Sequence, residues 1–210
     1  MNEFDLKAAG WDENPMHYER SKAVAEFIRR MIPLNKEMTA LEFGAGTGIT
    51  SMLLADSLRE ITMTDNSGGM VDAMNKRLIK TGLLNLKALH FDLEKDDYAG
   101  ETVDLLFSQM VLHHIADVDS IIRKIVSLLN PGGYIAIADI YPEDGSFHGT
   151  GFDGHKGFDP EELSVKLRQN KFENIACQKC FTIRKEANGQ MKEFDVFLLT
   201  GRLMDPKQSI

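Results

Sequence analysis

Short apolar runs alternate with segments of helical period along most of the chain. The runs are rich in β-forming residues and are bounded by glycine, proline or short polar residues. They predict strands at residues 38–43, 61–64, 86–91, 103–110 and 134–140. Strands that alternate with helical segments are typical of βαβ units, so we expect a parallel sheet covered by helices on both faces.

Apolar stripes and capping residues mark the helices. Residues 17–31 place Val24, Ile28 and Met31 on one face of a predicted helix. Similar stripes predict helices that end near residues 54, 81 and 129. Gly82 can cap the second of these in the left-handed conformation, and Asn130-Pro131-Gly132-Gly133 stops the third. Asp159 followed by Pro160 predicts the start of a final helix, with the aspartate as its cap.

The last two predicted strands, at about 173–185 and 192–202, flank Asn188-Gly189. That dipeptide favours a tight hairpin turn, so we expect the two strands to pair antiparallel. The sequence therefore predicts an α/β fold with a doubly wound, mostly parallel seven-stranded sheet and an antiparallel C-terminal hairpin. We expect a single domain over 1–210, made of an N-terminal helical lid (1–35), a core (36–140), a loop (141–158) and a C-terminal helix and hairpin (159–210).

Length and composition exclude some classes of function. The 210 residues favour one sizeable domain with its own core. Lys and Arg number 24 against 32 Asp and Glu, a net charge of -8, which disfavours nucleic acid as a partner. The longest apolar runs are far shorter than the roughly 20 residues of a membrane-spanning helix, so no membrane partner is expected. The acidic N-terminus lacks the apolar segment of a signal peptide, and we expect a cytoplasmic location.

The chain has two cysteines, Cys177 and Cys180. One pair cannot complete a four-ligand zinc site. The surrounding apolar residues follow a period of two, which predicts a strand, and residues three apart in a strand face opposite sides. This geometry disfavours a redox or metal role for the pair.

A glycine-rich loop, Gly44-Ala45-Gly46-Thr47-Gly48, joins the first predicted strand to its helix. In such a loop, backbone N–H groups and missing side chains let a ligand approach closely. The third glycine comes one residue earlier than in a dinucleotide fingerprint. Asp65 ends the second strand, where a carboxylate accepts hydrogen bonds from ribose hydroxyls, and Asp92 follows the third strand, where it could meet an exocyclic amine.

These elements, in this order, closely resemble the class I S-adenosylmethionine-dependent methyltransferases of the Rossmann-like superfamily. The resemblance covers about residues 41–140 and includes two further motifs, Leu112-His113-His114-Ile115 and Asn130-Pro131-Gly132-Gly133. It implies a Rossmann-like fold, S-adenosylmethionine as cofactor and S-adenosylhomocysteine as product.

The resemblance also implies which residues contact the cofactor. Gly44, Ala45 and Gly46 would lie against its methionine end, which Glu42 helps to order. The other implied contacts are Asp65, Asn66 and Met70 at the ribose and adenosine, Asp92 and Leu93 at the adenine, and Ser108 and Gln109 beside the methyl group. Trp11 and Tyr18 would belong to an N-terminal lid over the acceptor.

Fewer residues indicate where the methyl acceptor would bind. His113 and His114 lie just past the fourth strand, and a histidine titrates near neutral pH, so either could take a proton from the acceptor. The long loop offers His148, Asp153 and His155 as a two-histidine, one-carboxylate metal set, but its glycines favour a mobile substrate lid, and no metal is expected. Substrate contacts are expected at Tyr141, His148 and His155.

The leading interpretation is methyl transfer from S-adenosylmethionine to a small-molecule acceptor. An alternative is a non-catalytic protein that uses the same fold to hold the cofactor or a partner. A nicotinamide-dependent oxidoreductase is disfavoured by the early third glycine and the position of Asp92. The acceptor, the atom methylated and the oligomeric state are left open by the sequence.

Overall fold

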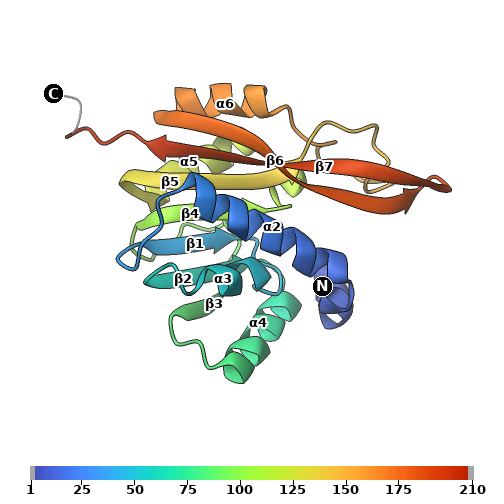
Figure 1. The fold of residues 1–210 in the computed structure, drawn as a ribbon, viewed down its shortest axis with the longest axis horizontal. Helices are drawn as coiled ribbons and strands as arrows, with labels where there is room; N and C mark the ends of the chain where they lie inside the picture. The colour runs from blue at the N-terminus through green and yellow to red at the C-terminus, as the bar shows by residue number, and fades with distance from the viewer. Residues whose placement is uncertain (1–2, 208–210) are drawn as a thin grey trace.

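The computed structural model describes residues 3–207, which form one seven-stranded sheet in the order β3-β2-β1-β4-β5-β7-β6 (Figure 1). The first five strands run parallel, whereas β7 is antiparallel to both β5 and β6. The strands are β1 Thr39–Phe43, β2 Glu60–Asp65, β3 Leu86–His90, β4 Val103–Gln109, β5 Leu129–Ile140, β6 Phe172–Ala187 and β7 Gln190–Leu203. The predicted fold class is confirmed.

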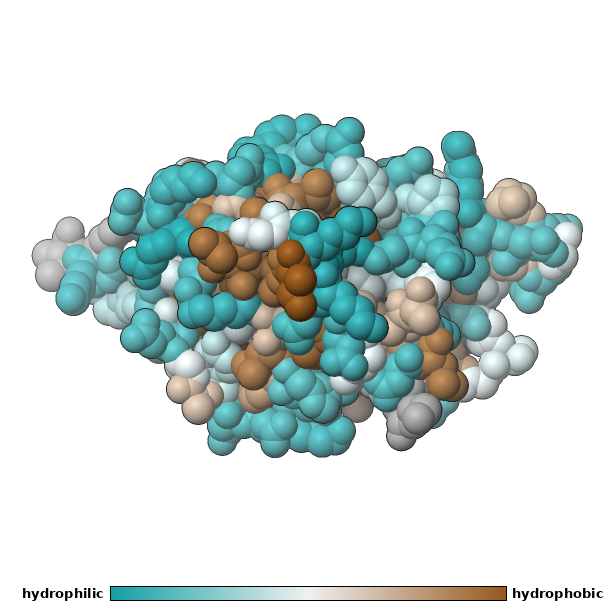
Figure 2. Space-filling model, turned by 90° about the horizontal axis from the view of Figure 1, so that it is seen from below, coloured by the Kyte–Doolittle hydropathy of each residue, from teal (hydrophilic) through white to brown (hydrophobic). Residues whose placement is uncertain are grey.

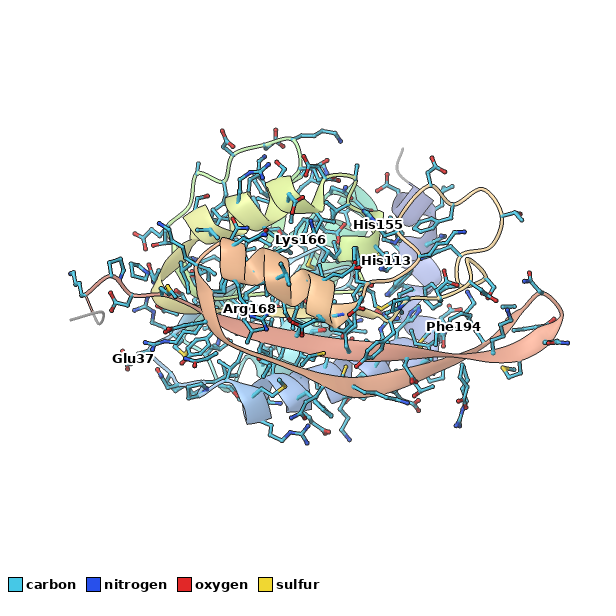
Figure 3. All side chains as sticks on the ribbon, turned by 90° about the horizontal axis from the view of Figure 1, so that it is seen from above. Glu37, His113, His155, Lys166, Arg168 and Phe194 are labelled. Atoms are coloured by element: carbon cyan, nitrogen blue, oxygen red, sulfur yellow. The ribbon has the colours of Figure 1, made fainter. Side chains whose placement is uncertain are left out.

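Helices cover both faces of the sheet. The α-helices and the short 3-10 helices (η) are α1 Glu3–Lys7, η1 Ala8–Glu13, α2 Pro15–Met31, α3 Ile49–Leu54, α4 Gly68–Thr81, η2 Leu112–His114, α5 Val118–Leu128 and α6 Pro160–Gln169. Helices α2, α3 and α4 lie on one face, and α5 and α6 lie on the other (Figures 1 and 3). The short elements α1 and η1 have no apolar period, which is why the sequence does not predict them.

Strand β4 shows how the two faces are filled. Its successive side chains alternate, so Leu105 and Phe107 pack in the core under α2 and α3, whereas Leu106 packs in the core under α5. All three are fully buried. Burying a side chain of this size stabilises the fold by about 1.5–3 kcal/mol, so the central strand is anchored from both faces.

Strand β5 starts earlier than the sequence predicts. The segment Asn130-Pro131-Gly132-Gly133 ends α5 as expected, but it already runs beside β4, with a register shift between Val103 and Leu105. The Asn130 side chain fastens it there, because its Nδ2 donates to Asp104 Oδ1 at 2.8 Å. A long-range side-chain bond of this kind gives no periodic signal in the sequence.

The C-terminal hairpin follows the predicted turn. Asn188 and Gly189 have φ angles of 54° and 73°, the left-handed conformation that a tight hairpin requires. Cys177 is exposed and Cys180 is buried, as expected for residues that face opposite sides of a strand, and both are free thiols. The hairpin extends well beyond the rest of the sheet (Figure 1).

The surface is mostly hydrophilic on the face seen from below Figure 1, with apolar side chains gathered near its centre (Figure 2). Ile79 of α4 and Leu84, which precedes β3, are among the most exposed large apolar residues. Within residues 3–207, none of the helices combines the length and the apolarity that crossing a membrane requires.

Candidate active site

A cavity of about 350 Å³ lies where the carboxyl ends of β1, β2 and β4 meet. This volume is typical of a small-molecule site, and the carboxyl edge of a parallel sheet is where such sites form. The glycine loop after β1 forms one wall, the N-terminal segment forms another, and the histidines after β4 close one end.

The glycine loop is held open by backbone geometry. Gly44 and Gly46 have φ angles of 66° and 58°, in the left-handed region, and a Cβ at Gly44 would collide with the Val111 side chain. The N–H of Ala45 donates to the Thr64 carbonyl at 2.8 Å, which ties the loop to β2. Gly44, Ala45 and Gly46 all line the cavity, where the resemblance places them.

Glu42 brings a carboxyl group into the base of the cavity. Its side chain accepts from the N–H of Ser51 at 3.2 Å and from the Ser51 hydroxyl at 2.5 Å, and only 2% of the residue is exposed. Burial raises the pKa of Glu42 to about 8, although the bonds from Ser51 act in the opposite direction. A cationic ligand group beside Glu42 would stabilise the ionised form.

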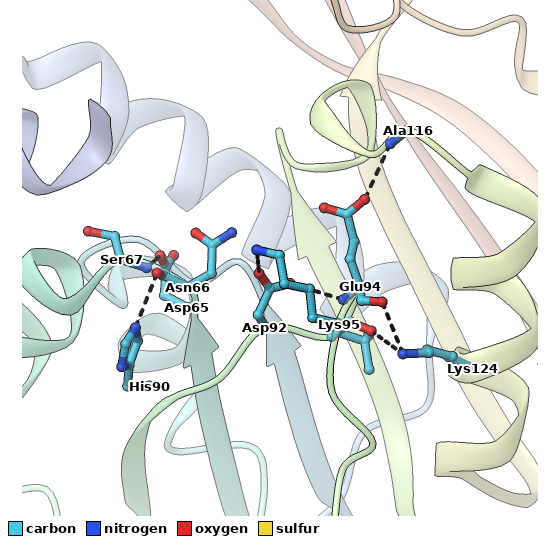
Figure 4. Close-up of polar contacts among 10 residues, drawn as sticks. Asp65, Asn66, Ser67, His90, Asp92, Glu94, Lys95, Ala116 and Lys124 are labelled. Carbon is cyan, nitrogen blue, oxygen red and sulfur yellow. Dashed lines mark hydrogen bonds and ion pairs between the residues drawn. The ribbon is translucent and has the colours of Figure 1, made fainter. Parts of the chain in front are cut away.

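Asp65 closes the turn between the glycine loop and α4. One carboxylate oxygen accepts from the N–H of Gly46 at 2.8 Å. The other accepts from the N–H of Ser67 at 2.9 Å (Figure 4). Burial raises the pKa of Asp65 despite these bonds. Asn66 and Met70 line the cavity beside it, so the three predicted ribose and adenosine contacts lie together.

Asp92 lines the cavity at the next strand end, whereas the neighbouring Leu93 is buried in the core and does not line it. Asp92 accepts from Lys95 Nζ at 2.7 Å and from the N–H of Glu94 at 3.1 Å (Figure 4). Burial acts to raise the pKa of Asp92, but the hydrogen bond and charge of Lys95 outweigh it, and the pKa lies below its usual value.

At the end of β4, Gln109 lines the cavity and Ser108 does not. The Gln109 amide donates to the Ser21 hydroxyl at 3.0 Å, which links β4 to α2. Ser108 is buried within the sheet. Of the two residues predicted beside the methyl group, Gln109 is therefore the one with access to a ligand.

Arg20 is a cavity residue that the sequence reading missed. It is 6% exposed, and its Nε has no hydrogen-bond partner among the residues that the structure describes. Burial lowers the pKa of Arg20 to about 10, which still leaves the guanidinium charged at neutral pH. A buried cation with a free donor is suited to an anionic ligand group. The signal was present, since Arg20 is spaced four and eight residues from Val24 and Ile28, within the apolar stripe.

The N-terminal segment lies over the cavity. Trp11 and Phe4 line it, and Trp11 stacks on His17 with ring centroids 4.3 Å apart. The segment is fastened to the glycine loop by the Thr47 hydroxyl, which donates to Asp12 at 2.7 Å. Tyr18, the other predicted lid residue, is 52% exposed and does not line the cavity.

Three histidines gather at the end of the cavity. His113 is 1% exposed, and its Nδ1 donates to Asp139 Oδ1 at 2.7 Å, which leaves Nε2 as the free ring nitrogen. Asp139 lies on β5 and was missed, although a lone carboxylate near the end of an apolar strand beside β4 is a readable signal. Candidate ligand atoms of His113, His114 and His148 lie within 4.8 Å of one another.

His148 reaches this cluster from the long connection between β5 and α6. It stacks on Phe152 with ring centroids 3.9 Å apart and an interplanar angle of 20°. Burial, with the charges of His113 and His114 as further causes, lowers the pKa of His148 to about 4. The connection is tied to the hairpin by two lysines, since Lys185 Nζ donates to the Phe147 carbonyl and Lys192 Nζ donates to Asp144, at 2.6 and 2.7 Å.

The other loop residues singled out in the sequence lie apart from the cavity. His155 Nε2 is 3.0 Å from the Ile115 carbonyl, and its backbone N–H donates to the His113 carbonyl. Figure 3 labels the side chains of His155 and His113. Asp153 is exposed, and within residues 3–207 neither Asp153 nor His155 belongs to a group with His148 that could hold a metal ion. Tyr141 packs edge-on against Phe197, with ring centroids 5.3 Å apart, and does not line the cavity.

Comparison with known proteins agrees with this geometry. The family model of the methyltransferase domain matches residues 41–137. A Haloferax volcanii methyltransferase solved with the Trm112 methyltransferase activator superposes with a TM-score of 0.75 at 18% identity, covering 97% of this chain and 99% of that one. The N-methyltransferase NodS from Bradyrhizobium japonicum, solved with S-adenosylhomocysteine, superposes with a TM-score of 0.68 at 20% identity, covering 93% and 90%. At these identities the structures support the fold.

Curated relatives extend the similarity beyond the core. An uncharacterised methyltransferase of Schizosaccharomyces pombe is 29% identical over 164 residues, which cover 70% of this chain and 56% of that protein. A polyketide synthase-nonribosomal peptide synthetase of Aspergillus clavatus is 30% identical over 196 residues, which cover 83% of this chain and 5% of that protein. The chain thus spans about half of the first relative and a small part of the second.

Proposed function

We propose that the chain is a class I, Rossmann-like methyltransferase, as the match of the methyltransferase domain model to residues 41–137 supports, and that it transfers the methyl group of S-adenosylmethionine to a small-molecule acceptor. The observation that carries the proposal is the convergence of Arg20, Glu42 and Asp65 on one cavity beside the glycine loop. The two carboxyl groups can accept from an ammonium group and from ribose hydroxyls, and the Arg20 Nε, which has no hydrogen-bond partner among the described residues, can donate to a carboxylate. An amino acid joined to a nucleoside carries all of these groups.

The cavity residues fit this cofactor by their donor and acceptor types. Arg20 offers a free, buried donor for the methionine carboxylate. Glu42 offers a carboxyl group for the methionine ammonium, and Asp65 offers remaining acceptor positions for the ribose hydroxyls. The cofactor supplies a methyl group already activated by its sulfonium, so the protein has mainly to orient the acceptor and exclude water.

The proposed proton acceptor is His113. Asp139 holds its ring in one orientation and takes the Nδ1–H, so the lone pair of Nε2 is available to an acceptor O–H or N–H. His114 is the second candidate, because it also lines the cavity. Trp11 and His148 are proposed as acceptor contacts on the same ground. The cytoplasmic location stays a prediction.

The first experiment is isothermal titration of the purified protein, freed of co-purified ligand, with S-adenosylmethionine, S-adenosylhomocysteine and NADH. We expect the two sulfur compounds to bind with about micromolar affinity, near -8 kcal/mol, and NADH not to bind. Arg20→Met should weaken binding by about 1.5–3 kcal/mol, because it removes a charged hydrogen-bond donor. Arg30→Met, on the exposed face of the same helix, is the matched control.

Mass spectrometry then follows methyl transfer to a panel of small hydroxyl, amine and thiol compounds. Binding with transfer supports the enzyme. Binding without transfer to any acceptor class, together with capture of a protein partner, would favour the non-catalytic alternative. Absence of binding to either sulfur compound would contradict the cofactor assignment.

A further inference from the structure

The histidine cluster contains more imidazoles than one proton acceptor needs. His113 and His114 come from η2, and His148 comes from a connection more than 30 residues further along the chain. Candidate ligand atoms of all three lie within 4.8 Å of one another, and residues 3–207 hold no other group of three or more His, Cys, Asp or Glu side chains placed to bind a metal ion. The proposed reaction needs one of these rings as proton acceptor and does not explain why three imidazoles are gathered around one point.

Hydrogen bonding prepares His113 to act as a ligand. Its Nδ1 donates to one oxygen of Asp139, and its backbone N–H donates to the other at 3.2 Å, so ring and backbone are held by the same buried carboxylate. A ligating histidine in a metal site typically donates its second nitrogen to a carboxylate in this way, which fixes the ring and increases its basicity. Nε2 of His113 is then directed away from Asp139.

Aromatic packing holds the other two rings close to His113. The ring centroids of His113 lie 4.3 Å from those of His114 and 4.9 Å from those of His148. Phe152 stacks on His148 and meets His114 edge-on at 5.3 Å. An apolar wall around a set of ligands limits water access and strengthens their interaction with a cation.

The donor set indicates the kind of metal. Imidazole nitrogen suits zinc and its neighbours in the first transition series, whereas magnesium and calcium prefer oxygen. Metal–nitrogen bonds in such sites are about 2.0–2.1 Å, so the rings of His114 and His148 would have to move closer to His113. His114 is half-buried and His148 is exposed, so neither ring is enclosed on all sides by the protein.

We propose that His113, His114 and His148 bind one divalent transition-metal ion, with Asp139 as the carboxylate that orients His113. The site differs from the set of His148, Asp153 and His155 that the sequence offered, because His155 bonds to the Ile115 carbonyl instead. The consequence for activity rests on the proposed function: a metal ion on Nε2 of His113 occupies the lone pair that proton transfer needs. Metal binding therefore inhibits methyl transfer at the acceptor end of the cavity.

The test is metal binding by the untagged protein of residues 1–210 without cofactor. Titration with Co²⁺ is followed by its visible absorption, which reports nitrogen coordination, and Zn²⁺ affinity is measured by competition with a chromophoric chelator. We expect one ion per chain with a dissociation constant of about 1 μM, which is near -8 kcal/mol. His114→Gln and His148→Gln should each weaken binding at least tenfold, and Asp139→Asn should weaken it by about 10- to 100-fold.

His155→Gln is the matched control, since this loop histidine lies outside the cluster, and it should bind Co²⁺ as the unaltered protein does. No cobalt absorption, or equal affinity in the doubly substituted His114→Gln, His148→Gln protein, would overturn the site. Because binding is measured without cofactor or acceptor, its failure leaves the proposed methyl transfer standing. Conversely, failure of the cofactor titration leaves the metal site standing and removes only its inhibitory role.

Discussion

The two ends of the cavity are built in different ways. At the end proposed to hold the cofactor, called here the cofactor end, Glu42, Gly46 and Asp65 come from one strand-loop-helix-strand unit, and the backbone N–H groups of Gly46 and Ser67 hold Asp65. At the histidine end, His113 depends on Asp139 of another strand, and His148 comes from a connection without regular structure. Apart from Arg20, which reaches it from α2, the first end follows from local turns and strand order, whereas the second depends on contacts between distant parts of the chain.

The largest expected effect is on turnover at the histidine end. Once an acceptor is identified, His113→Gln should lower the methyl-transfer rate by about 10²- to 10⁴-fold, the usual contribution of a general base. Affinity for S-adenosylhomocysteine should stay within about twofold, because the cofactor end keeps all its groups. Single-turnover kinetics and calorimetry measure the two quantities separately.

Asp139→Asn is the companion variant, since it keeps the size of the side chain but changes what it offers to His113. A comparable loss of turnover supports a dyad, and full turnover in both variants would exclude His113 as the base. A loss of cofactor affinity in either variant would show that the two ends are coupled.

The next effect concerns stability at the cofactor end. The pKa of Glu42 rises from 4.5 to about 8 on folding, so its protonated form is favoured in the folded state. The contribution of protonated Glu42 to the free energy of unfolding is therefore fully present below pH 4.5. It is lost as pH rises through about 8, which lowers the free energy of unfolding by up to about 4–5 kcal/mol. Glu42→Gln, a neutral side chain of the same size, should be more stable than the unaltered protein at pH 8.

Urea unfolding of both proteins at pH 5 and pH 8 checks this prediction. The two stabilities should converge at pH 5, and the variant should bind S-adenosylmethionine more weakly at pH 8. An identical pH dependence of the two proteins would mean that Glu42 does not carry the shift.

The smallest effect is expected for Asp65→Ala. Loss of this acceptor should weaken cofactor binding by about 1–3 kcal/mol, which is roughly 5- to 150-fold, because buried partners are left unsatisfied. Calorimetry measures the affinity, and thermal unfolding reports whether the turn around Gly46 and Ser67 survives. Unchanged affinity in a folded variant would contradict the ribose assignment.

The fold and the cofactor end could largely be predicted from the sequence. Apolar runs predict the strands. The glycine loop, Asp65 and Gly82 could be predicted because the backbone geometry at each depends on residues close by in the sequence. Gly82, for example, ends α4 with a φ angle of 67°, as its position predicts. Leu93 and Ser108 show the limit of this approach, because only the packed structure reveals which neighbour of a strand-end residue faces the cavity.

The histidine end could be predicted only in part. His113 and His114 follow a strand and were identified, but their partner Asp139 is 26 residues away in the chain. The sequence grouped His148 with His155 because they are close in the loop, whereas the structure turns His155 toward Ile115 and brings His148 to His113. Side-chain direction in a glycine-rich connection is set by tertiary contacts, which no local pattern encodes.

The long hairpin of β6 and β7 bears on how a protein with this fold could change its acceptor during evolution. Lys185 and Lys192 of β6 and β7 hold the 141–158 connection, and Phe194 packs edge-on against Phe147 in it. Substitutions on this arm would shift His148, at the proposed acceptor end of the cavity, while leaving the glycine loop and Asp65 untouched. Under the proposed function, selection for a new acceptor can therefore act on the hairpin, a region remote from the proposed cofactor contacts, without renewed selection for cofactor binding.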